Sequence, residues 1–324
     1  MGVKGSVLAI DAGNSKTDVA LIGADGSLLS TARGGGFQPP VVGIGTAVDV
    51  LGATVERVLA SAGAGVEAVA HVSACLANAD LPVEEEQLTE ALGARGWGRT
   101  VEVRNDTFAI LRAGVDEPRG VAVVCGAGIN CVGMLPDGRT ARFPAIGRIS
   151  GDWGGGSGLA EEALWYAARA EDGRGEPTEL ARALPGHFGL GSMYALIEAL
   201  HLGRIEYERR HELTPVLFAV GAAGDAVAHG LVDRLAQEVV AMASVALSRL
   251  GLLDEHAPVV LGGSVLAARH PQLDDRIAGL LAVKAPKAVV RVVKESPVLG
   301  AGLLGLDHTG AATEVHDRLR AQYT

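Results

Sequence analysis

Residues 6–33 read SVLAIDAGNSKTDVALIGADGSLLSTAR, and the order of turns in this stretch is the strongest fold signal in the chain. An apolar run ends at Asp11-Ala12-Gly13, a second covers 18–23, and Asp25-Gly26 leads into a third. Asp-Gly between apolar runs is a strong hairpin signal. The stretch therefore predicts three consecutive strands, with a glycine turn after the first and a hairpin turn after the second.

The same order of turns recurs about 115 residues later. Residues 121–143 read VAVVCGAGINCVGMLPDGRTARF, with a glycine turn at 126–128 and a hairpin turn at 136–138. Self-similarity of this kind indicates a repeated structural unit. We therefore expect two related halves, each beginning with three strands.

The segments that follow each unit alternate in their apolar spacing, which predicts alternating helices and strands. Helices are expected over 41–62, 84–92, 158–170, 192–202, 225–250, 297–306 and 315–322, and strands over 66–73, 101–104, 258–261 and 289–293. Alternation predicts an α/β fold with helices covering the sheets. We expect a domain boundary near residue 115, giving domains 1–115 and 116–306, with the C-terminal helix (about 307–324) packed on the first.

Composition narrows the class of partner and the compartment. The 324 residues include 28 Lys and Arg against 38 Asp and Glu, a net charge of -10, which disfavours nucleic acid and anionic membranes as partners. The start of the chain does not resemble a signal peptide, and the apolar stretch 239–253 is too interrupted to span a bilayer. Cys75, Cys125 and Cys131 lack metal-site spacing and fit a reducing cytoplasm.

Both glycine turns suit phosphate binding. A tight turn after a buried strand directs backbone N–H groups and small hydroxyls towards one point, and Asp11 at the strand end can hold Mg²⁺ through water. Two such turns could hold a polyphosphate from both sides; ordinary hairpin turns are the alternative. The candidate residues are Gly13, Asn14, Ser15, Lys16, Thr17, Gly126, Ala127 and Gly128.

Gly262-Gly263-Ser264 follows the apolar strand at 258–261. Glycine lets a flat ring lie against the backbone, and the N-terminus of a following helix favours phosphate. This segment is therefore a candidate contact for a nucleotide, with a purely structural turn as the alternative.

Two further segments carry candidate substrate chemistry. Asp106 follows shortly after the strand expected at 101–104. A carboxylate at this place could accept the proton of a substrate hydroxyl. The alternative for Asp106 is an N-cap for a helix that begins at Thr107. The glycine-rich loop 147–158, with Asp152 and Trp153, suits a polar ligand or a structural loop.

The order of these five motifs resembles the superfamily of sugar kinases, heat-shock ATPases and actin. Within it, the chain resembles the BadF/BadG/BcrA/BcrD ATPase family and its N-acetylglucosamine kinases essentially from end to end. Residues 8–18 and 124–133 are similar to the two phosphate motifs, 259–265 to the adenosine motif and 297–304 to the final connecting helix. The resemblance implies a two-domain actin-like ATPase fold, built from duplicated ribonuclease-H-like domains, with an interdomain cleft.

The resemblance also implies ligands and roles. It implies ATP and Mg²⁺, with Asp11 at the metal, Asp106 as the catalytic base for a sugar hydroxyl and Thr214 near adenine. It implies an enzyme with a small-molecule sugar as partner and, by analogy, a homodimer. The candidate substrate-binding residues are Gln38, Asn105, Asp106, Asn130, Gly147, Arg148 and Asp152.

The sequence departs from the family where the sugar binds. Gly36-Phe37-Gln38-Pro39 stands in place of the family's Ser-Thr-Asn, 144–147 reads PAIG in place of Gly-Gly-Trp-Gly, and Trp153 replaces a Glu. Ala127 replaces a Thr between the second-turn glycines. The nucleotide motifs thus match better than the sugar motifs.

Three alternatives to an N-acetylglucosamine kinase therefore stay open. The first is a kinase for another amino sugar or an anionic sugar, for which Arg148 is the candidate contact. The second is a non-catalytic sugar sensor. The third is an activator ATPase with an iron–sulfur cluster, which would require accessible thiolate ligands.

Overall fold

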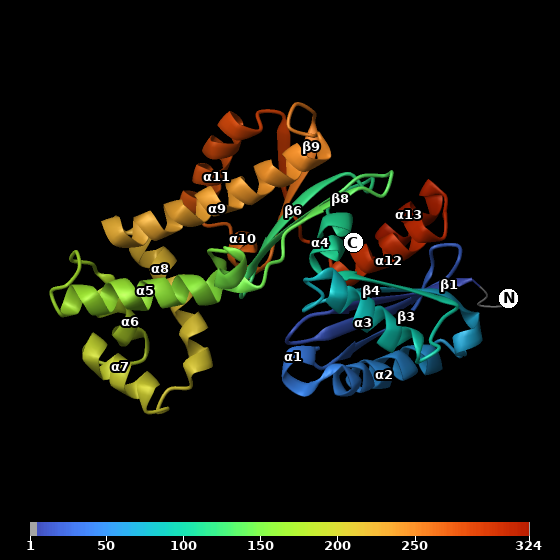
Figure 1. Ribbon diagram of the computed structural model, residues 1–324, viewed down its shortest axis with the longest axis horizontal. Coiled ribbons are helices and arrows are strands. Elements are labelled where there is room, and N and C mark those ends of the chain that lie inside the picture. Colours follow the sequence, from blue (N-terminus) through green and yellow to red (C-terminus); the bar gives the residue numbers. More distant parts are fainter. Residues whose placement is uncertain (1–4, 324) are drawn as a thin grey trace. The chain divides into compact units, whose positions relative to one another are not determined.

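The computed structural model describes residues 5–323, in which two sheets are covered by helices (Figure 1). In the first sheet the strand order is β3-β2-β1-β4-β5. Its strands are β1 (Ser6–Ala12), β2 (Thr17–Ile22), β3 (Leu28–Gly34), β4 (Val69–Leu76) and β5 (Thr100–Asn105). β1, β2 and β3 pair antiparallel, whereas β4 and β5 continue the sheet in parallel.

The second sheet repeats this arrangement, with the order β10-β9-β6-β7-β8. Its strands are β6 (Gly120–Cys125), β7 (Ile129–Met134), β8 (Thr140–Arg142), β9 (Ala257–Gly262) and β10 (Ala288–Val292). Counted from the three-strand unit, β8-β7-β6-β9-β10 matches β3-β2-β1-β4-β5 position by position. The predicted duplication and the two-domain α/β fold are confirmed.

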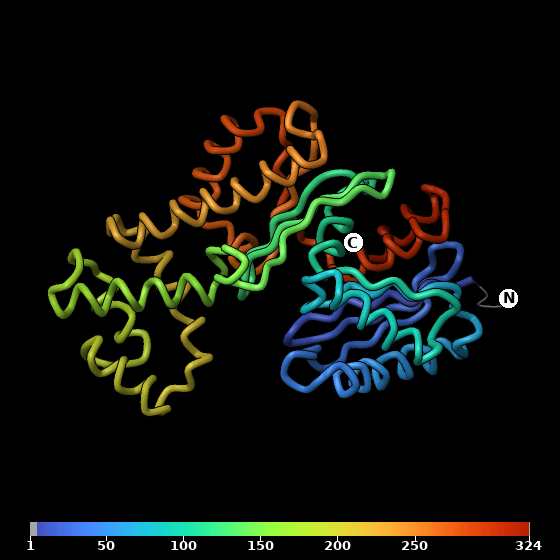
Figure 2. Tube along the Cα trace, viewed as in Figure 1, coloured from blue at the N-terminus to red at the C-terminus, as the bar shows by residue number. Residues whose placement is uncertain are grey.

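The chain divides into two compact units. The first comprises the residues up to 122, 132–144 and 293 onward; the second comprises 123–131 and 145–292. The division passes through β6 and β7, and the boundary near residue 115 stays a prediction. In the first unit, α12 (Pro297–His308) and α13 (Thr313–Arg320) lie beside the N-terminal strands, as Figure 2 shows by their colours.

Helices of the first unit cover both faces of its sheet. They are α1 (Pro39–Val42), α2 (Ile44–Ser61), α3 (Pro82–Gly93) and α4 (Thr107–Ala113), besides α12 and α13. Val48, Leu51, Val55 and Val58 recur at helical spacing on α2 and are buried against one face of the sheet with Leu88 of α3. The other face, along β1 and β4, packs against α12.

The second unit is mainly helical. Its helices are α5 (Gly155–Glu171), α6 (Leu180–His187), α7 (Met193–His201), α8 (Leu213–Ala222), α9 (Ala226–Leu250), α10 (Ser264–Ala267) and α11 (Pro271–Lys284). The long helix α9 begins where the Asp225 side chain accepts from Ala228 N at 2.9 Å, and it ends at Gly251 in the left-handed conformation.

Some predicted elements need correction. The single helix expected over 41–62 is interrupted at Gly43, which has φ 81° and ends α1 before α2 begins. The strand expected from residue 66 starts at Val69, after the 3₁₀ turn Val66–Ala68. The helices α6, α8 and α11 were not predicted. Pro185 and Pro215 lie within the first two, where proline disfavours a helix, and α11 carries its apolar residues sparsely.

No single described helix is long and apolar enough to cross a membrane. The segments Tyr207–Ala222 and Ala226–Leu250 meet the length and composition criteria only when taken together, and they are bent by 110° at their junction.

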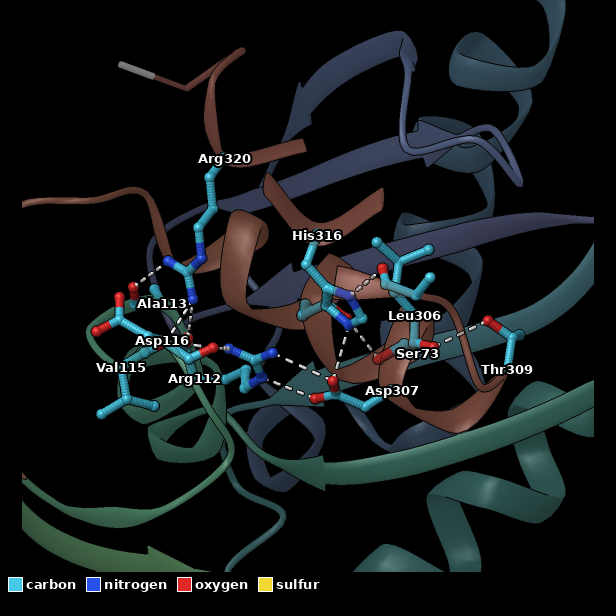
Figure 3. Close-up of polar contacts among 12 residues, drawn as sticks. Ser73, Arg112, Ala113, Val115, Asp116, Leu306, Asp307, Thr309, His316 and Arg320 are labelled. Carbon is cyan, nitrogen blue, oxygen red and sulfur yellow. Dashed lines mark hydrogen bonds and ion pairs between the residues drawn. The ribbon is translucent and has the colours of Figure 1, made fainter. Parts of the chain in front are cut away.

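A buried ion-pair network joins α4, α12 and α13 in the first unit (Figure 3). Arg112 is 2% exposed and binds both carboxylate oxygens of Asp307, with N–O distances of 2.7 and 3.1 Å. His316 reaches Asp307 Oδ1 at 2.9 Å. Burial alone would raise the pKa of Asp307, but the bonds from His316 and Arg112 outweigh it and lower that pKa. The hydrogen bond with Asp307 raises the pKa of His316.

We expect Asp307→Asn to reduce the free energy of unfolding by about 3 kcal/mol, because it leaves Arg112 buried without its counter-charge. The His316 contribution is full below the unfolded-state pKa of about 6.5 and disappears as pH rises through the raised folded-state pKa. The difference in the free energy of unfolding between wild type and Asp307→Asn should therefore narrow above neutral pH, as measured by urea denaturation.

Asp25→Asn is the matched control, because Asp25 pairs with Arg318 on the exposed surface at 2.8 Å. Exposed pairs contribute little, so this variant should unfold like wild type. Equal effects of the two substitutions would show that burial of the Arg112 pair does not matter.

Candidate functional site

The first glycine turn is fixed to the loop that carries Gln38. Gly13 N donates to Lys16 O at 2.9 Å, which closes the turn between β1 and β2. Gln38 Nε2 donates to Asn14 O at 2.7 Å, and Asn78 Nδ2 donates to Asn14 Oδ1 at 2.9 Å. A candidate phosphate residue and a candidate substrate residue are therefore in direct contact.

The remaining candidates of this turn differ in exposure. Ser15 and Lys16 are exposed, and Lys16 Nζ lies 3.8 Å from Asp18 Oδ2. Thr17 is buried, and its Oγ1 has no hydrogen-bond partner among the described residues. The turn thus presents polar groups whose hydrogen-bonding capacity the described chain does not use up.

Asp11, at the end of β1, stands in a negative field. Burial raises the pKa of Asp11 to about 7, repulsion from Asp106 and Asp18 adds to the effect, and Lys16 opposes it. A divalent cation would relieve this repulsion. A lone carboxylate at the end of a strand suits Mg²⁺, which keeps most of its water shell.

Asp106 lies where β5 ends and α4 begins, and it makes no side-chain capping hydrogen bond. The neighbouring Asn105 caps the helix instead, because its Oδ1 accepts a hydrogen bond from Thr107 N at 2.9 Å. Burial raises the pKa of Asp106 to about 6, with hydrogen bonding to Thr107 acting in the opposite direction. A half-buried carboxylate with this pKa can accept a proton near neutral pH.

A polar network that the sequence did not reveal holds Asn105. Asn105 Nδ2 donates to Asp80 Oδ1 at 2.8 Å, and its backbone N donates to Glu85 Oε1 at 3.2 Å. Arg142 Nη1 in turn donates to Glu85 Oε2 at 2.6 Å. Burial, followed by repulsion from Asp106, raises the pKa of Asp80 to about 7. These partners lie 20 or more positions from Asn105, so no local pattern could have identified them.

In the second unit, backbone segments converge on the second glycine turn. Gly126 N donates to Gly128 O at 3.0 Å, and Ser157 N of α5 donates to Ala127 O at 3.1 Å. Gly155 has φ 74°, and a Cβ there would lie 2.4 Å from Ala127 O. Gly263 has φ 82°, and a Cβ there would lie 2.5 Å from the Cys125 carbonyl. Only glycine fits at either position.

One cavity of this unit, partly open to solvent, is lined by four of the candidate nucleotide residues. Those that line it are Gly126, Ala127, Thr214 and Ser264. Phe218 and His270 form a further wall, with rings stacked 3.9 Å apart at 4°. Burial lowers the pKa of His270, which keeps its ring neutral. Nothing in the spacing of Phe218 and His270 predicted this wall.

Two expectations about this cavity change. The helix after Gly263 is α10, which has only four residues, so the expected attraction of phosphate to a helix N-terminus is weak there. Thr214 uses its hydroxyl to donate to Gly156 O at 2.7 Å. Thr214 therefore fixes α8 to the start of α5, and contributes mainly shape to the cavity.

A second cavity, also partly open to solvent, gathers candidate sugar residues. It is lined by Gly147, Arg148 and Asp152, and it shares Ala127 and Ser157 with the first. Asp152 Oδ2 accepts from Gly147 N at 2.9 Å and from Ser150 Oγ at 2.6 Å, which folds the loop on itself.

Two other candidates have partners on the protein. Arg148 is exposed and pairs with Glu162. Asn130 Oδ1 accepts from Cys131 N at 2.7 Å in β7. Asn130 does not line either of these two cavities.

Cys75, Cys125 and Cys131 are buried and carry free thiols. Burial raises the pKa of each thiol, which disfavours the thiolate form that an iron–sulfur cluster needs. Their burial argues against the activator alternative.

The duplicated five-stranded sheets define an actin-like fold of the kind found in sugar kinases, and solved structures agree. A protein from Chromobacterium violaceum, provisionally described as an N-acetylglucosamine kinase, matches with a TM-score of 0.69 and 22% identity, over 94% of this chain and 99% of that one. A ROK family glucokinase from Streptomyces griseus, solved with glucose and AMPPNP, matches with a TM-score of 0.54 and 17% identity over 94% and 99%.

The model of the BadF/BadG/BcrA/BcrD ATPase family matches residues 8–305, and the chain belongs to that family. An N-acetylmuramic acid/N-acetylglucosamine kinase of Clostridium acetobutylicum is 25% identical over 301 residues, which cover 92% of this chain and 97% of the relative. An N-acetyl-D-glucosamine kinase of Dictyostelium discoideum is 25% identical over 244 residues, covering 72% and 75%.

We expect Gly263→Ala to weaken binding of a non-hydrolysable ATP analogue at least tenfold in isothermal titration calorimetry. The added Cβ would collide with the Cys125 backbone and displace the second glycine turn. Gly279→Ala is the control, because it lies exposed in α11 with nothing within 4 Å of an added Cβ. Unchanged affinity in the Gly263 variant would remove this turn from the nucleotide site.

Proposed function

We propose that the protein transfers the γ-phosphoryl group of ATP to a hydroxyl of an amino sugar. The observation that carries the proposal is Asp106, a half-buried carboxylate with a raised pKa that makes no side-chain capping bond, in a member of an ATPase family. The named relatives supply the substrate class, since both are kinases of N-acetylated amino sugars.

In this proposal the stacked wall of Phe218 and His270 accommodates the adenine ring, because flat rings stack well on one another. The backbone of the second glycine turn, at 126–128, is a proposed phosphate contact in the second unit, and the turn at 13–17 is a proposed phosphate contact in the first. Asp11 holds Mg²⁺, which supplies charge neutralisation at the phosphates. Catalysis then rests on positioning and charge, as phosphoryl transfer requires.

The sugar is placed by hydrogen bonds and activated by Asp106. In the first unit the proposed sugar contacts are Asn105 and Gln38. In the second unit they are Gly147 and Asp152. The attacking hydroxyl oxygen forms the new bond to the γ-phosphorus, and the bond from that phosphorus to the β–γ bridging oxygen breaks. The hydroxyl proton passes to the Asp106 carboxylate, and ADP leaves. A homodimer stays a prediction from the resemblance, and a cytoplasmic location stays a prediction from the cysteine content.

We expect Asp106→Asn to lower kcat by a factor of about 100 or more, because an amide cannot accept the proton. Its melting temperature should stay near that of wild type, because Asn105 binds the Thr107 amide. Wild-type kcat/KM should fall as pH drops below about 6, where Asp106 becomes protonated. The pH profile is measured by coupled detection of ADP with N-acetylglucosamine.

Asp49→Asn, on the exposed face of α2, should keep wild-type rates in the same assay. Near-native turnover in the Asp106 variant, with both proteins folded, would exclude Asp106 as the base.

An anionic amino sugar is a second candidate substrate, because Arg148 lines the cavity that contains Asp152. A guanidinium that binds a substrate carboxylate makes a charge-assisted hydrogen bond. Arg148→Ala should therefore raise KM for N-acetylmuramic acid at least tenfold while changing KM for N-acetylglucosamine little.

Arg174→Ala serves as the control, since Arg174 pairs with Asp172 on the surface of the same unit. Equal changes in KM for the two sugars in the Arg148 variant would reject a carboxylate-binding role and favour a neutral substrate.

A further inference from the structure

Three potential metal ligands gather in the first unit, outside the proposed site. His71 lies in β4, Glu102 in β5, and His308 is the last residue of α12. One donor atom from each lies within 4.8 Å of the others, which makes them the one such group of His, Cys, Asp or Glu among residues 5–323. The proposed kinase chemistry uses none of them.

The fold fixes where these three residues stand. β4 and β5 pair in parallel, with His71 opposite Thr100 and Ser73 opposite Glu102. Ser73, two positions after His71 on the same face of β4, donates to Ala301 O of α12 at 2.7 Å. At Gly305 the helix runs so close to the sheet that a Cβ would lie 2.3 Å from Val7 Cγ1. The C-terminal end of α12 is thereby held beside His71.

His71 presents a free nitrogen lone pair. Its Nδ1 lies 2.9 Å from Thr100 Oγ1, and the Thr100 hydroxyl donates its own hydrogen to Ala70 O at 3.2 Å. When the Thr100 hydroxyl donates to Ala70 O, Nδ1 carries the hydrogen of the imidazole and Nε2 is left unprotonated. His71 is 1% exposed, and its Nε2 is buried with no hydrogen-bond partner among the described residues. A buried acceptor without a partner costs free energy unless something binds it.

Glu102 is oriented by a neighbour. Arg104 donates to Glu102 Oε1 from Nε at 3.0 Å and from Nη2 at 2.7 Å. Oε2 is the oxygen that faces His308, at 3.6 Å from Nδ1. The Arg104 charge opposes a cation nearby, but the same contact fixes the carboxylate in place, as groups that hydrogen-bond to metal ligands do.

His308 is the adjustable member of the group. Its ring stacks on that of His71 with centroids 3.8 Å apart and planes at 8°, while the side chain is 45% exposed. Tetrahedral coordination at about 2.1 Å places donor atoms about 3.4 Å apart, so ion binding would draw the three donors closer together, and the exposed His308 side chain is the one with room to rotate. The negative end of the α12 dipole at His308 favours a cation there.

We propose that His71, Glu102 and His308 form a site for one divalent transition-metal ion of the zinc class, with water as the fourth ligand. Two imidazoles and one carboxylate suit zinc. They suit Mg²⁺ and Ca²⁺ poorly, because those ions prefer oxygen ligands. The ion would join β4, β5 and the end of α12, and so stabilise the packing of that helix on the sheet.

The test uses the full chain without a histidine tag, freed of metal by a chelator and titrated with Co²⁺ and Zn²⁺ at pH 7. We expect one equivalent of Co²⁺ to give the visible absorption bands of tetrahedral cobalt and one equivalent of Zn²⁺ to displace it. His308→Ala and Glu102→Gln should each weaken Zn²⁺ binding at least tenfold, and Thr100→Val should weaken it about tenfold by releasing the His71 ring.

His201→Ala removes an exposed histidine at the end of α7 and should bind metal like wild type. Saturating Zn²⁺ should raise the melting temperature of wild type and of His201→Ala, but not of His308→Ala. Failure of wild type to bind a stoichiometric ion, or wild-type affinity in both ligand variants, would overturn the proposal. These readouts do not depend on kinase activity, so they stand apart from the proposed function.

Discussion

The candidate nucleotide site depends on close backbone approach around residues 125–128, which only glycine permits. Gly155 and Gly263 both have positive φ. A Cβ added at Gly155 would lie 2.4 Å from Ala127 O, and one added at Gly263 would lie 2.5 Å from the Cys125 carbonyl. Their contacts place the start of α5 and the end of β9 against the second glycine turn. Ala127 consequently lines both the cavity of the nucleotide candidates and that of the sugar candidates.

Electrostatics impose the complementary constraint in the first unit. Asp11, Asp80 and Asp106 all have pKa values raised first by burial, and mutual repulsion adds to the shift at Asp11 and Asp80. A carboxyl group whose folded-state pKa is raised favours folding most when protonated. Their contribution to the free energy of unfolding is therefore largest below about pH 4 and is lost as the pH rises towards about 7. Carboxylates gathered at such a cost are typical of a site that binds cations or moves protons.

The sequence was sufficient for the features that local chemistry dictates. The glycine turns, the Asp25-Gly26 hairpin and the apolar strands predicted both three-strand units, and the duplication followed from their shared order. The wall of Phe218 and His270, the Asp80 contact with Asn105 and the stack of His71 on His308 could not be predicted. Each of these contacts joins residues tens to hundreds of positions apart, so it exists only after the chain has folded.

³¹P nuclear magnetic resonance tests most directly whether this member of the ATPase family transfers a phosphoryl group from ATP to an amino sugar. Purified protein is incubated with Mg²⁺, ATP and, in separate samples, N-acetylglucosamine, N-acetylmuramic acid, glucosamine and glucose. We expect the γ-phosphate resonance to disappear and a sugar phosphate ester to appear in equal amount, with the N-acetylated amino sugars reacting fastest. Release of inorganic phosphate alone, or no ester from any amino sugar, would contradict the account.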